Sequence, residues 1–510
     1  MRDISRREAL DFHSKKRPGK IEVVPTKRYR TQRDLALAYS PGVAEPCKSI
    51  SKRKSDVYKY TAKSNLVGVI TNGSAVLGLG NIGPEAAKPV MEGKGLLFKI
   101  YADIDVFDIE LNVDDIDSFV STVKAMEPTF GGINLEDIKA PECFEIEKRL
   151  SSELSIPVMH DDQHGTAIIS GAALINALEL VNKKIDKIKI VVNGAGAAAI
   201  SCLKLYIRLG VKRKNIVLCD SKGVIRKDRE NLSKHKRRFA TNRRIHTLSD
   251  AIKNSDVFIG LSVGNIVTQK MIKSMNKNAI VFAMANPDPE ISYVNAKKAR
   301  KDIIMATGRS DFPNQVNNVL GFPYIFRGAL DVRASQINES MKVAAVRAIA
   351  SLAKESVPED VNLAYHGKNL SFGTDYIIPK PNDPRLIIRV SIAVAKAAIK
   401  SGVAKKEITD WDKYQEFLTD RLGLDNRLIR SFNRIAKDNK KRILFVEADN
   451  YNVLKSAEVL QSEQLCSPIL LGNKDFINNL ADSNGIDLSG IVIIDPKSQE
   501  LREKRHQYAD

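Results

Sequence analysis

Residues 187–210 read KIKIVVNGAGAAAISCLKLYIRLG, and this segment decides the fold. Its first part predicts a short buried strand, its glycine-rich centre a tight turn, and its last part a helix. The next strand-like run, NIVLCDSKG, ends near Asp220, about 25 residues after the glycines. In this order Gly194 makes the turn, Gly196 admits a pyrophosphate, and the small Ala199 lets helix and strand pack closely. The pattern predicts a Rossmann-like dinucleotide-binding unit.

Three more strand-like runs, 255–262, 278–290 and 301–318, continue the predicted sheet. Each ends in small or polar residues, as strands do where their carboxyl ends face a ligand crevice. The asparagines at these ends are usually turn formers, and the alternative is contact with a carboxylate and a cofactor amide. They are Asn286, Asn317 and Asn318. Two strong helical patterns follow, over 335–355 and 383–403.

Two acidic pairs precede this unit. Glu136 and Asp137 follow a Gly-Gly sequence where we expect a turn, and Asp161 and Asp162 precede a helix predicted over 166–181. That helix is apolar nearly all round, which predicts burial, and its N-terminus favours carboxylates. Two interpretations stay open for the pairs: solvated helix caps, or ligands of a cation that offsets close negative charges.

Two more positions stand out for their surroundings. Lys94 lies between Gly93 and Gly95, ahead of an apolar run that predicts a strand. We expect it on a turn, either at the surface or where the backbone comes close to a ligand. Tyr39 begins the sequence Tyr-Ser-Pro-Gly, which breaks a short apolar run and presents the tyrosine on a turn. The run between them, 67–83, predicts a strand punctuated by glycines.

Composition bounds the classes of function. A chain of 510 residues is too long for one core and suggests roughly three domains. It has no apolar run of roughly 18 residues and no secretory signal, so we expect no membrane span and a cytoplasmic location. Five cysteines without CxxC spacing fit reduced thiols. The net charge is +19, but the basic run 222–244 lacks interleaved aromatics, so anionic metabolites or a nucleotide phosphate are favoured over nucleic acid.

The character of the sequence changes beyond Trp411. Residues 414–440 predict a helix. The runs 442–448, 467–473 and 490–495 predict three strands of a fresh α/β alternation. Roughly 70 residues with three strands make a poor independent core. We therefore expect the beginning of a domain whose remainder is absent.

Five blocks resemble those of the bacterial NADP-dependent malic enzymes: DLALAYSPGVAEPC, GLGNIGPEAAKPVMEGK, TFGGINLEDIKAPECF, HDDQHGTAI and VNGAGAAA. The resemblance covers about residues 8–425, and the remainder is similar to the start of the phosphotransacetylase-like domain of the larger bacterial forms. It implies an α/β fold with a malic enzyme N-terminal domain over 1–160, a Rossmann-like NAD(P)-binding domain over 161–425, and a partial phosphotransacetylase-like domain over 426–510. Phosphate acetyl transfer is not expected from so short a domain.

The implied reaction is the oxidative decarboxylation of malate to pyruvate and CO₂ with reduction of NADP. The resemblance implies that Glu136, Asp137 and Asp162 bind Mg²⁺ or Mn²⁺. All-oxygen ligands without histidine or cysteine suit such a hard cation. A metal beside a base eases loss of the C2 hydroxyl proton, and it also stabilises the enolate that remains when CO₂ leaves.

The resemblance also assigns roles to single residues. It implies that Lys94 is the general base, Tyr39 the general acid and Asp161 a partner of Lys94. The implied cofactor contacts are Gly194, Ala195, Gly196, Ala197, Ala198, Asp220 and Asn286, and the implied substrate contacts are Lys94, Asn286, Asn317 and Asn318. Longer malic enzymes hold the substrate carboxylate with an arginine where this chain has Ser74 and Ala75. Ser74 or the asparagines are the candidates for that role here.

The choice of cofactor rests on the end of the second strand. Asp220 there is typical of NAD sites, because such a carboxylate binds the ribose 2′-hydroxyl. Lys222, Arg226 and Lys227 can instead pair with a 2′-phosphate, and the resemblance favours NADP. The alternatives are an NAD-linked enzyme, an enzyme acting mainly as an oxaloacetate decarboxylase, an idle regulatory protein and a basic nucleic-acid binder. We expect a homo-oligomer that acts on malate.

Overall fold

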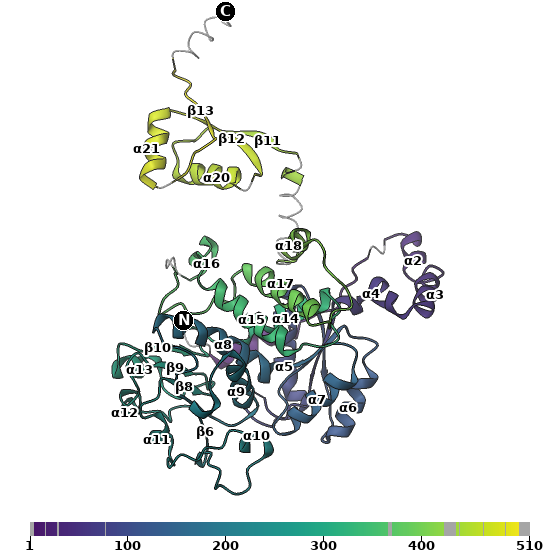
Figure 1. Cartoon of the computed structure of the whole chain (residues 1–510). Coiled ribbons are helices and arrows are strands. Elements are labelled where there is room, and N and C mark those ends of the chain that lie inside the picture. The colour runs from purple at the N-terminus through teal and green to yellow at the C-terminus, as the bar shows by residue number, and fades with distance from the viewer. Residues whose placement is uncertain are drawn as a thin grey trace, which may run out of the picture. The chain divides into compact units, whose positions relative to one another are not determined.

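The computed structural model describes residues 5–15, 17–27, 30–76, 78–365, 370–422, 435–437, 439–462, 464–484 and 486–498 (Figure 1). The chain divides into two compact units, Met1–Leu422 and Gly423–Asp510. None of the helices in these described ranges is both long and apolar enough to cross a membrane.

The first unit begins with short helices and a four-stranded parallel sheet. The strands are β1 (Leu66–Thr71), β2 (Asp105–Glu110), β3 (Gly132–Leu135) and β4 (Val158–His160), in the order β2-β1-β3-β4. The helices up to β4 are α1 (Arg6–Ser14), α2 (Gln32–Ala38), α3 (Ala44–Lys52), α4 (Val57–Tyr60), α5 (Pro84–Ala102), α6 (Ile116–Ala125) and α7 (Glu142–Glu153). All four strands run the same way, so their carboxyl ends share one edge of the sheet.

Three local predictions in this region are wrong. The strand predicted over 67–83 ends at Thr71, and the glycine-rich remainder forms turns. Lys94 lies inside α5 rather than on a turn, and the apolar run after it continues that helix instead of forming a strand. The helix persists because Met91, Phe98 and Ala102 bury one face of it. The Gly-Gly sequence before Glu136 forms no turn, since its second glycine already begins β3.

The second sheet has the strand order β10-β9-β8-β5-β6-β7, and only β7 runs antiparallel to its neighbour. Its strands are β5 (Ile190–Asn193), β6 (Ile216–Asp220), β7 (Gly223–Val224), β8 (Val257–Gly260), β9 (Ile280–Ala283) and β10 (Ile304–Thr307). The first strand, β5, lies between β6 and β8, which is the doubly wound arrangement of dinucleotide-binding folds. The predicted strand–turn–helix–strand order and the three further strands are confirmed.

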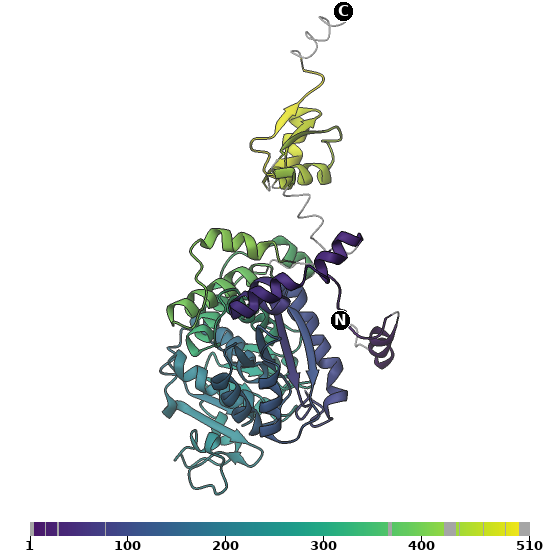
Figure 2. The same ribbon diagram turned by 90° about the vertical axis from the view of Figure 1, so that its right-hand side faces the viewer.

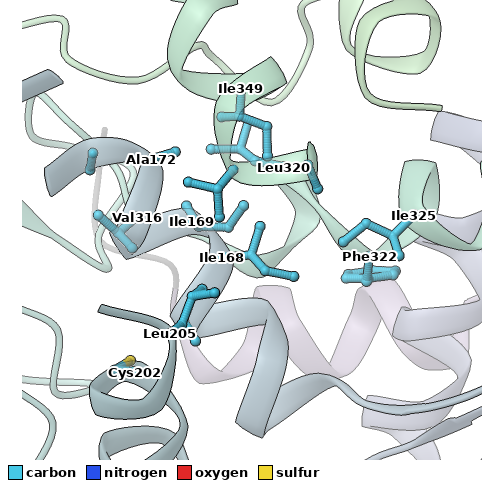
Figure 3. Packing of buried hydrophobic residues seen from close by; sticks show 14 of the residues in the cluster. Ile168, Ile169, Ala172, Cys202, Leu205, Val316, Leu320, Phe322, Ile325 and Ile349 are labelled. Atoms are coloured by element: carbon cyan, nitrogen blue, oxygen red, sulfur yellow. The ribbon is translucent and has the colours of Figure 1, made fainter. Parts of the chain in front are cut away.

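Helix α8 (Asp161–Leu180) is the buried axis of the first unit. It packs against α9 (Ala197–Leu209) and α15 (Glu339–Leu352), as its all-round apolar character predicts. Figure 3 shows Ile168 and Ile169 of α8 among side chains such as Leu205 and Ile349. The helix begins at Asp161, five residues earlier than predicted, so both aspartates belong to its first turn.

The remaining helices of the first unit surround these two sheets. They are α10 (Lys234–Arg237), α11 (Leu248–Ile252), α12 (Gln269–Lys273), α13 (Tyr293–Ala299), α14 (Phe322–Asp331), α16 (Glu359–Ala364), α17 (Arg385–Lys400) and α18 (Trp411–Thr419). Short 3-10 helices are η1 (Lys54–Asp56), η2 (Ala62–Asn65), η3 (Arg213–Asn215) and η4 (Asn318–Leu320). The predicted strand over 301–318 covers only β10, because its last residues turn into η4.

The second unit has a three-stranded parallel sheet in the order β11-β12-β13. Its elements are β11 (Lys441–Phe445), α20 (Tyr451–Ser462), β12 (Cys466–Leu471), α21 (Lys474–Asn484) and β13 (Val492–Ile494). The predicted α/β alternation is confirmed. Leu454 and Ala457 of α20, Leu470 of β12, and Ile477 of α21 form its small apolar core. Of the helix predicted over 414–440, residues 423–434 and 438 lie outside the described residues.

Candidate active site

Three carboxylates meet at the carboxyl edge of the first sheet. Glu136, Asp137 and Asp162 each offer a carboxylate oxygen within 4.8 Å of the others. Strand β3 pairs with β4 so that Leu135 lies opposite His160. The residues that follow these two strands are therefore neighbours, although they are far apart in the sequence. The backbone N–H of Asp137 donates a hydrogen bond to Asp162 Oδ2 at 2.8 Å.

Lys94 reaches this cluster from α5. Its Nζ atom lies 2.7 Å from Asp161 Oδ2 and 2.8 Å from Glu136 Oε1. The ammonium also stands 4.4 Å from the centre of the Phe322 ring. Only 11% of the Lys94 side chain is exposed. The lysine is therefore enclosed by two carboxylates and an aromatic face.

The charges around Lys94 shift the pKa values of Lys94 and Glu136. Burial alone lowers the pKa of Lys94, but Asp161, Glu136 and Asp162 outweigh it, so the pKa is raised above its ordinary value. The pKa of Glu136 lies well above its ordinary value. Burial is the largest cause, and the nearby Asp162, Asp161 and Asp137 add to it, while Lys94 acts in the opposite direction. The neighbouring carboxylates therefore favour the ammonium form of Lys94. A positive charge bound near them would weaken their hold on its proton.

The two aspartates of the second pair take different positions. Asp161 Oδ2 accepts hydrogen bonds from Lys94 and, at 3.2 Å, from Asn318 Nδ2. Asp162 instead faces the backbone of Asp137. Successive helical residues point about 100° apart, so the first turn of α8 sends one carboxylate to each partner. A Cβ atom at Gly165 would lie 2.1 Å from Asp161 Oδ1, so this position of α8 must be glycine.

The predicted asparagines do not all reach the carboxylates. Asn318 does, through Asp161, and it also accepts a hydrogen bond from Thr166 Oγ1 at 3.2 Å. The side chain of Asn317 accepts from the backbone N–H of Val319 at 3.0 Å, which makes it the cap of η4. Asn286 lies beyond the end of β9, where its side-chain amide approaches Gly308.

The glycine-rich loop after β1 borders the carboxylates on another side. The backbone N–H of Ala75 donates to the carbonyl of Asp137 at 2.9 Å. Ser74 Oγ donates to Asn72 Oδ1 at 2.6 Å and accepts from the backbone N–H of Lys139 at 3.0 Å. The hydroxyl of Ser74 is therefore used within the loop, which leaves the asparagines as the better candidates for contact with a substrate carboxylate.

The dinucleotide turn has the predicted geometry. Gly194 has φ +106, and a Cβ atom there would lie 2.1 Å from the carbonyl oxygen of Leu261. Gly196 is the N-cap of α9, and a Cβ atom there would meet no atom within 4 Å. The open N-terminus of α9, including Ala197 and Ala198, is suited to bind phosphate.

Asp220 is held by cations that the sequence patterns did not single out. Arg229 donates to both of its carboxylate oxygens, at 2.9 and 3.0 Å, and Lys236 lies at 3.3 Å. The backbone N–H of Lys222 donates to Oδ1 at 3.0 Å. Although burial acts to raise it, the pKa of Asp220 is lowered by these bonds. The dense basic run containing both cations was the only available signal.

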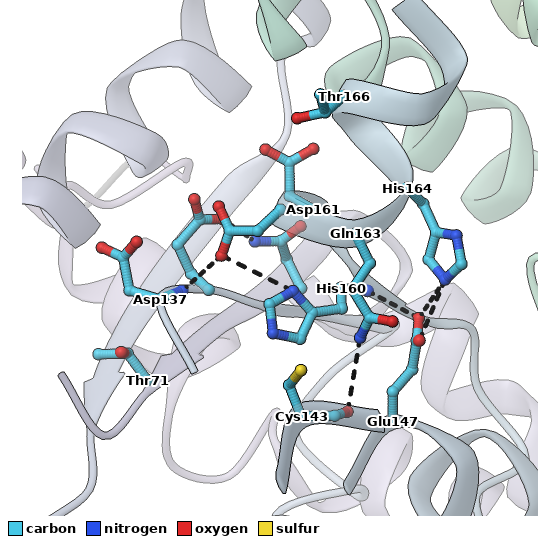
Figure 4. Close-up of polar contacts among 12 residues, drawn as sticks. Thr71, Asp137, Cys143, Glu147, His160, Asp161, Gln163, His164 and Thr166 are labelled. Carbon is cyan, nitrogen blue, oxygen red and sulfur yellow. Dashed lines mark hydrogen bonds and ion pairs between the residues drawn. The ribbon is translucent and has the colours of Figure 1, made fainter. Parts of the chain in front are cut away.

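A buried polar network behind the carboxylates was also missed. Figure 4 shows Glu147 of α7 joined to the ring of His164 and the backbone of His160. Burial acts to raise the pKa of Glu147, but His164 and Lys342 lower it to about 2. Asn134 Nδ2 supports the site from β3 by donating to Glu136 Oε2 at 2.9 Å. The sequence signal for this network is the pair His160 and His164, which lie four residues apart at the start of α8.

Tyr39 is not brought to this cluster. It is the C-cap of α2, and 78% of it is exposed. Among the described residues, its hydroxyl has no hydrogen-bond partner. The chain therefore unites Lys94, Asp161 and the three carboxylates, and leaves the predicted general acid elsewhere.

Glu110 is the last residue of β2, at the same edge of the sheet. Its raised pKa makes the free energy of unfolding depend on pH. Burial, then the neighbouring Asp108, raises its pKa from 4.5 to about 7. Its stabilising contribution is therefore complete below pH 4.5 and is lost as pH rises through 7. We expect Glu110→Gln to stabilise the protein at pH 8 by about 1 kcal/mol, a value discounted for partial exposure, and to change little at pH 4.5. Thermal unfolding at both pH values, with the exposed Glu45→Gln as control, measures this; equal shifts would contradict the assignment.

Fold and site together define a class of α/β proteins in which a doubly wound, dinucleotide-binding sheet adjoins a parallel sheet that carries a carboxylate–lysine cluster. The family profile of the malic enzyme N-terminal domain matches residues 18–151, and that of the malic enzyme NAD binding domain matches residues 163–365. The profile of phosphate acetyl/butaryl transferase matches residues 428–510. The chain belongs to the malic enzyme family.

Individual relatives agree with this membership. The chain is 53% identical over 515 residues to an NADP-dependent malic enzyme of Haemophilus influenzae, covering 100% of this chain and 68% of the relative. It is 49% identical over 505 residues to an NAD-dependent malic enzyme of Rhizobium meliloti, covering 99% and 66%. The crystal structure of malic enzyme from Pyrococcus horikoshii superposes with a TM-score of 0.76 at 42% identity, covering 84% of this chain and 98% of that one.

Proposed function

We propose that this chain catalyses the oxidative decarboxylation of malate to pyruvate and CO₂ with reduction of NADP. The observation that carries the proposal is the position of Lys94, between Asp161 and Glu136 and beside a three-carboxylate cluster. A reaction that removes a proton from an alcohol needs a base next to a site for a positive charge. The family membership supports the same reaction.

The cluster fits a hard divalent cation, Mg²⁺ or Mn²⁺. Glu136, Asp137 and Asp162 offer only oxygen, and two of them are buried. Glu136 has Asp137, Asp161 and Asp162 nearby and Lys94 as its one cation, which leaves an excess of negative charge that a divalent ion would offset. These three residues would hold the ion, while Asp161 stays with Lys94. When bound, such an ion would polarise the C2 oxygen of malate, and the nicotinamide would accept the C2 hydride.

The chain's own residues then divide the proton transfers. Lys94 accepts the proton of the C2 hydroxyl, and Asp161 holds the resulting ammonium in place. Asn318 donates a hydrogen bond to Asp161 and so holds the orientation of its carboxylate. Contact of Asn318 with the substrate is part of the proposal. Loss of CO₂ from the oxidised substrate leaves an enolate of pyruvate, whose C3 takes up a proton. We propose the Tyr39 hydroxyl as its donor on the family resemblance alone, since in this structure Tyr39 is exposed and lies outside the cluster.

The direct test is an absorbance assay of malate-dependent NADPH formation with Mn²⁺. We expect reduction of NADP together with stoichiometric pyruvate. The absence of reduction with both NADP and NAD would remove the proposal. NADPH formation without pyruvate would leave a simple malate dehydrogenase, and oxaloacetate decarboxylation without malate oxidation would favour the decarboxylase alternative.

The preference for NADP is proposed from the surroundings of Asp220. Its carboxylate is neutralised by Arg229 and Lys236, so it is poorly placed to accept hydrogen bonds from a ribose diol. The side chains of these two cations are partly exposed and suit a 2′-phosphate. The existence of an NAD-dependent relative keeps the NAD-linked alternative open to test.

We expect the double variant Arg229→Met/Lys236→Met to lose preference for NADP. Its kcat/KM with NADP should fall about 10- to 100-fold, because two charge-assisted contacts are lost and Asp220 then repels the phosphate. With NAD the value should change far less. Parallel assays with both cofactors measure this, with Arg243→Met from the same basic run as control. An equal fall with both cofactors would show that the cations serve only the local fold.

A further inference from the structure

Glu290 lies beyond the end of β9, and it is completely buried. Its carboxylate accepts three hydrogen bonds. The backbone N–H and the hydroxyl of Ser262 donate to Oε1 at 2.8 and 3.0 Å, and the backbone N–H of Ala285 donates to Oε2 at 3.1 Å. Ser262 lies in the loop after β8, and Ala285 lies in the loop after β9. One side chain therefore joins two loops at the carboxyl edge of the second sheet.

The backbone around this carboxylate leaves room for it. A Cβ atom at Gly260, the last residue of β8, would lie 2.3 Å from Glu290 Cδ, so this position must be glycine. Backbone hydrogen bonds join the same two loops again. They run from Asn265 to the carbonyl of Pro289 at 3.0 Å and from Val267 to that of Glu290 at 2.9 Å. Both loops thus fix the position of the carboxylate.

Glu290 is an unusual residue for the interior of a sheet. Among the described residues, no lysine, arginine or histidine forms an ion pair with its carboxylate. Burial raises the pKa of Glu290 above its ordinary value, although the N–H donors act to lower it. A buried carboxylate without a cation is unfavourable for folding. Such departures from ordinary core chemistry are expected where function requires them.

The carboxylate is linked to two features that the sequence assigned to the cofactor. Asn193 Nδ2 donates to Ser262 Oγ at 2.7 Å, and Asn193 immediately precedes the dinucleotide turn. On the other side, Ala285 immediately precedes Asn286, the predicted contact of both cofactor and substrate. Glu290 therefore connects the turn that would hold the pyrophosphate with the asparagine that would meet the reacting end of the cofactor.

Asn286 lies where loops of the two sheets of the first unit meet. A Cβ atom at Gly78, in the glycine-rich loop after β1, would lie 3.6 Å from the carbonyl oxygen of Asn286. A Cβ atom at Gly308, after β10, would lie 3.0 Å from its side-chain amide. Figures 1 and 2 both show the teal second sheet adjacent to the blue and purple first sheet. A shift of the loop after β9 would therefore move Asn286 relative to both sheets.

We propose that Glu290 is a positioning residue, whose carboxylate holds the loops after β8 and β9 so that the dinucleotide turn and Asn286 act on the same bound nicotinamide nucleotide. The inference rests on the proposed function and adds a residue to it. Because Glu290 is completely buried, it acts through Ser262 and Ala285 rather than on the cofactor itself. A carboxylate suits this role because it only accepts hydrogen bonds, and all three of its partners donate.

Glu290→Gln in the full chain tests the proposal. The glutamine has the same length, but its amide nitrogen is a donor, so the N–H of Ser262 or of Ala285 loses its acceptor. We expect the Kd for NADP, measured by calorimetric titration, to rise about 10- to 100-fold and kcat for malate oxidation to fall about tenfold. The Kd for Mn²⁺ should stay within about threefold, because the carboxylate cluster belongs to the first sheet.

Malate deuterated at C2 gives a readout that a loss of stability alone does not change. The deuterium isotope effect on kcat should be larger for Glu290→Gln than for the wild type, because a misplaced nicotinamide slows hydride transfer more than the other steps. An unchanged isotope effect together with an unchanged Kd for NADP would overturn the proposal.

The matched control is Asp256→Asn, at the amino edge of the same sheet. Asp256 also joins strand ends, since it accepts from the backbone N–H of Lys189 at 2.8 Å and pairs with Lys183 Nζ at 2.9 Å. This variant should lower the melting temperature but leave the Kd for NADP within about twofold of wild type. Equal losses of NADP binding in both variants would show that Glu290 serves only the stability of the sheet.

A second variant keeps the test decisive if Glu290→Gln folds poorly. Ser262→Ala removes the hydroxyl and keeps the N–H, so the Kd for NADP should rise about 3- to 10-fold. In the Glu290→Gln background the same change should add little, because both residues act through one contact. A Ser262→Ala protein that binds NADP as the wild type does, or fully additive effects of the two changes, would contradict the proposal.

The wild type separates this inference from the proposed function. If the wild type binds NADP but does not oxidise malate, the proposed function is wrong, and the calorimetric comparison still decides whether Glu290 positions the cofactor. If the wild type oxidises malate and Glu290→Gln matches it in Kd for NADP and in kcat, only this inference is wrong.

Discussion

Replacing Lys94 by alanine is expected to reduce malate oxidation by about 10³- to 10⁴-fold while NADP binding stays within about threefold of wild type. The lysine is the only cation among the described residues that contacts Asp161 and Glu136, so no other group takes the hydroxyl proton. The dinucleotide turn belongs to another sheet and does not depend on this side chain. Stopped-flow absorbance and calorimetric titration with NADP measure the two quantities.

The stability of this variant must be followed as well. Without the ammonium, Asp161 and Glu136 are left buried and unpaired, which costs about 3–5 kcal/mol. A lower melting temperature is therefore expected, but not loss of NADP binding. The matched control is Lys88→Ala, since Lys88 lies on the same helix and pairs with Asp108 instead. Substantial malate oxidation by Lys94→Ala would remove the lysine from the proposed mechanism.

The second large effect is expected from Asp162→Asn. The asparagine can still accept the hydrogen bond from the N–H of Asp137, so the local fold is kept while one negative charge is removed. We expect malate oxidation and oxaloacetate decarboxylation to fall together by about 100-fold or more, because both depend on the cation that this cluster would hold.

Ligand-induced stabilisation gives a readout independent of activity. Saturating Mn²⁺, at about 100 times its Kd, should stabilise the wild-type protein by about 2.7 kcal/mol, and a chelator should reverse the effect. Asp162→Asn should lose most of this stabilisation at the same Mn²⁺ concentration. Asp117→Asn changes an exposed aspartate paired with Arg149 and serves as control. An undiminished Mn²⁺ shift in Asp162→Asn would exclude it as a ligand.

Local sequence patterns were sufficient for the second sheet and for α8. The spacing of Gly194 and Gly196 predicted the tight turn. At Gly194 a Cβ atom has no room, and at Gly196 the backbone stays open. Periodicity alone identified the buried strands around it and the all-round apolar helix α8. These features are local because each depends on residues that are close to one another in the sequence.

The same reasoning failed where distant packing overrode local preference. The two glycines around Lys94 predicted a turn, yet α5 runs through them because its apolar face is buried. Gly95 also packs closely on β2, since a Cβ atom there would lie 3.3 Å from Val106. The sequence left NAD and NADP open at Asp220 and favoured NADP by resemblance, and only the folded chain places Arg229 and Lys236 on its carboxylate. The substrate contact predicted for Asn317 stays a prediction, and the fold shows that this residue also caps η4.

The sequence by itself determined the fold class, the dinucleotide turn and the presence of two acidic pairs beside a family-specific lysine. Only the tertiary structure decided which of those carboxylates contacts Lys94 and which contacts Asp137. The pairing of β3 with β4 places Glu136 near the start of α8, and the helical rotation between consecutive residues turns Asp161 to Lys94 and Asp162 to Asp137. It also decided that Tyr39 is exposed and lies apart from the carboxylate cluster. Strand register and the packing of one helix against distant elements are non-local, and no pattern within a short window encodes them.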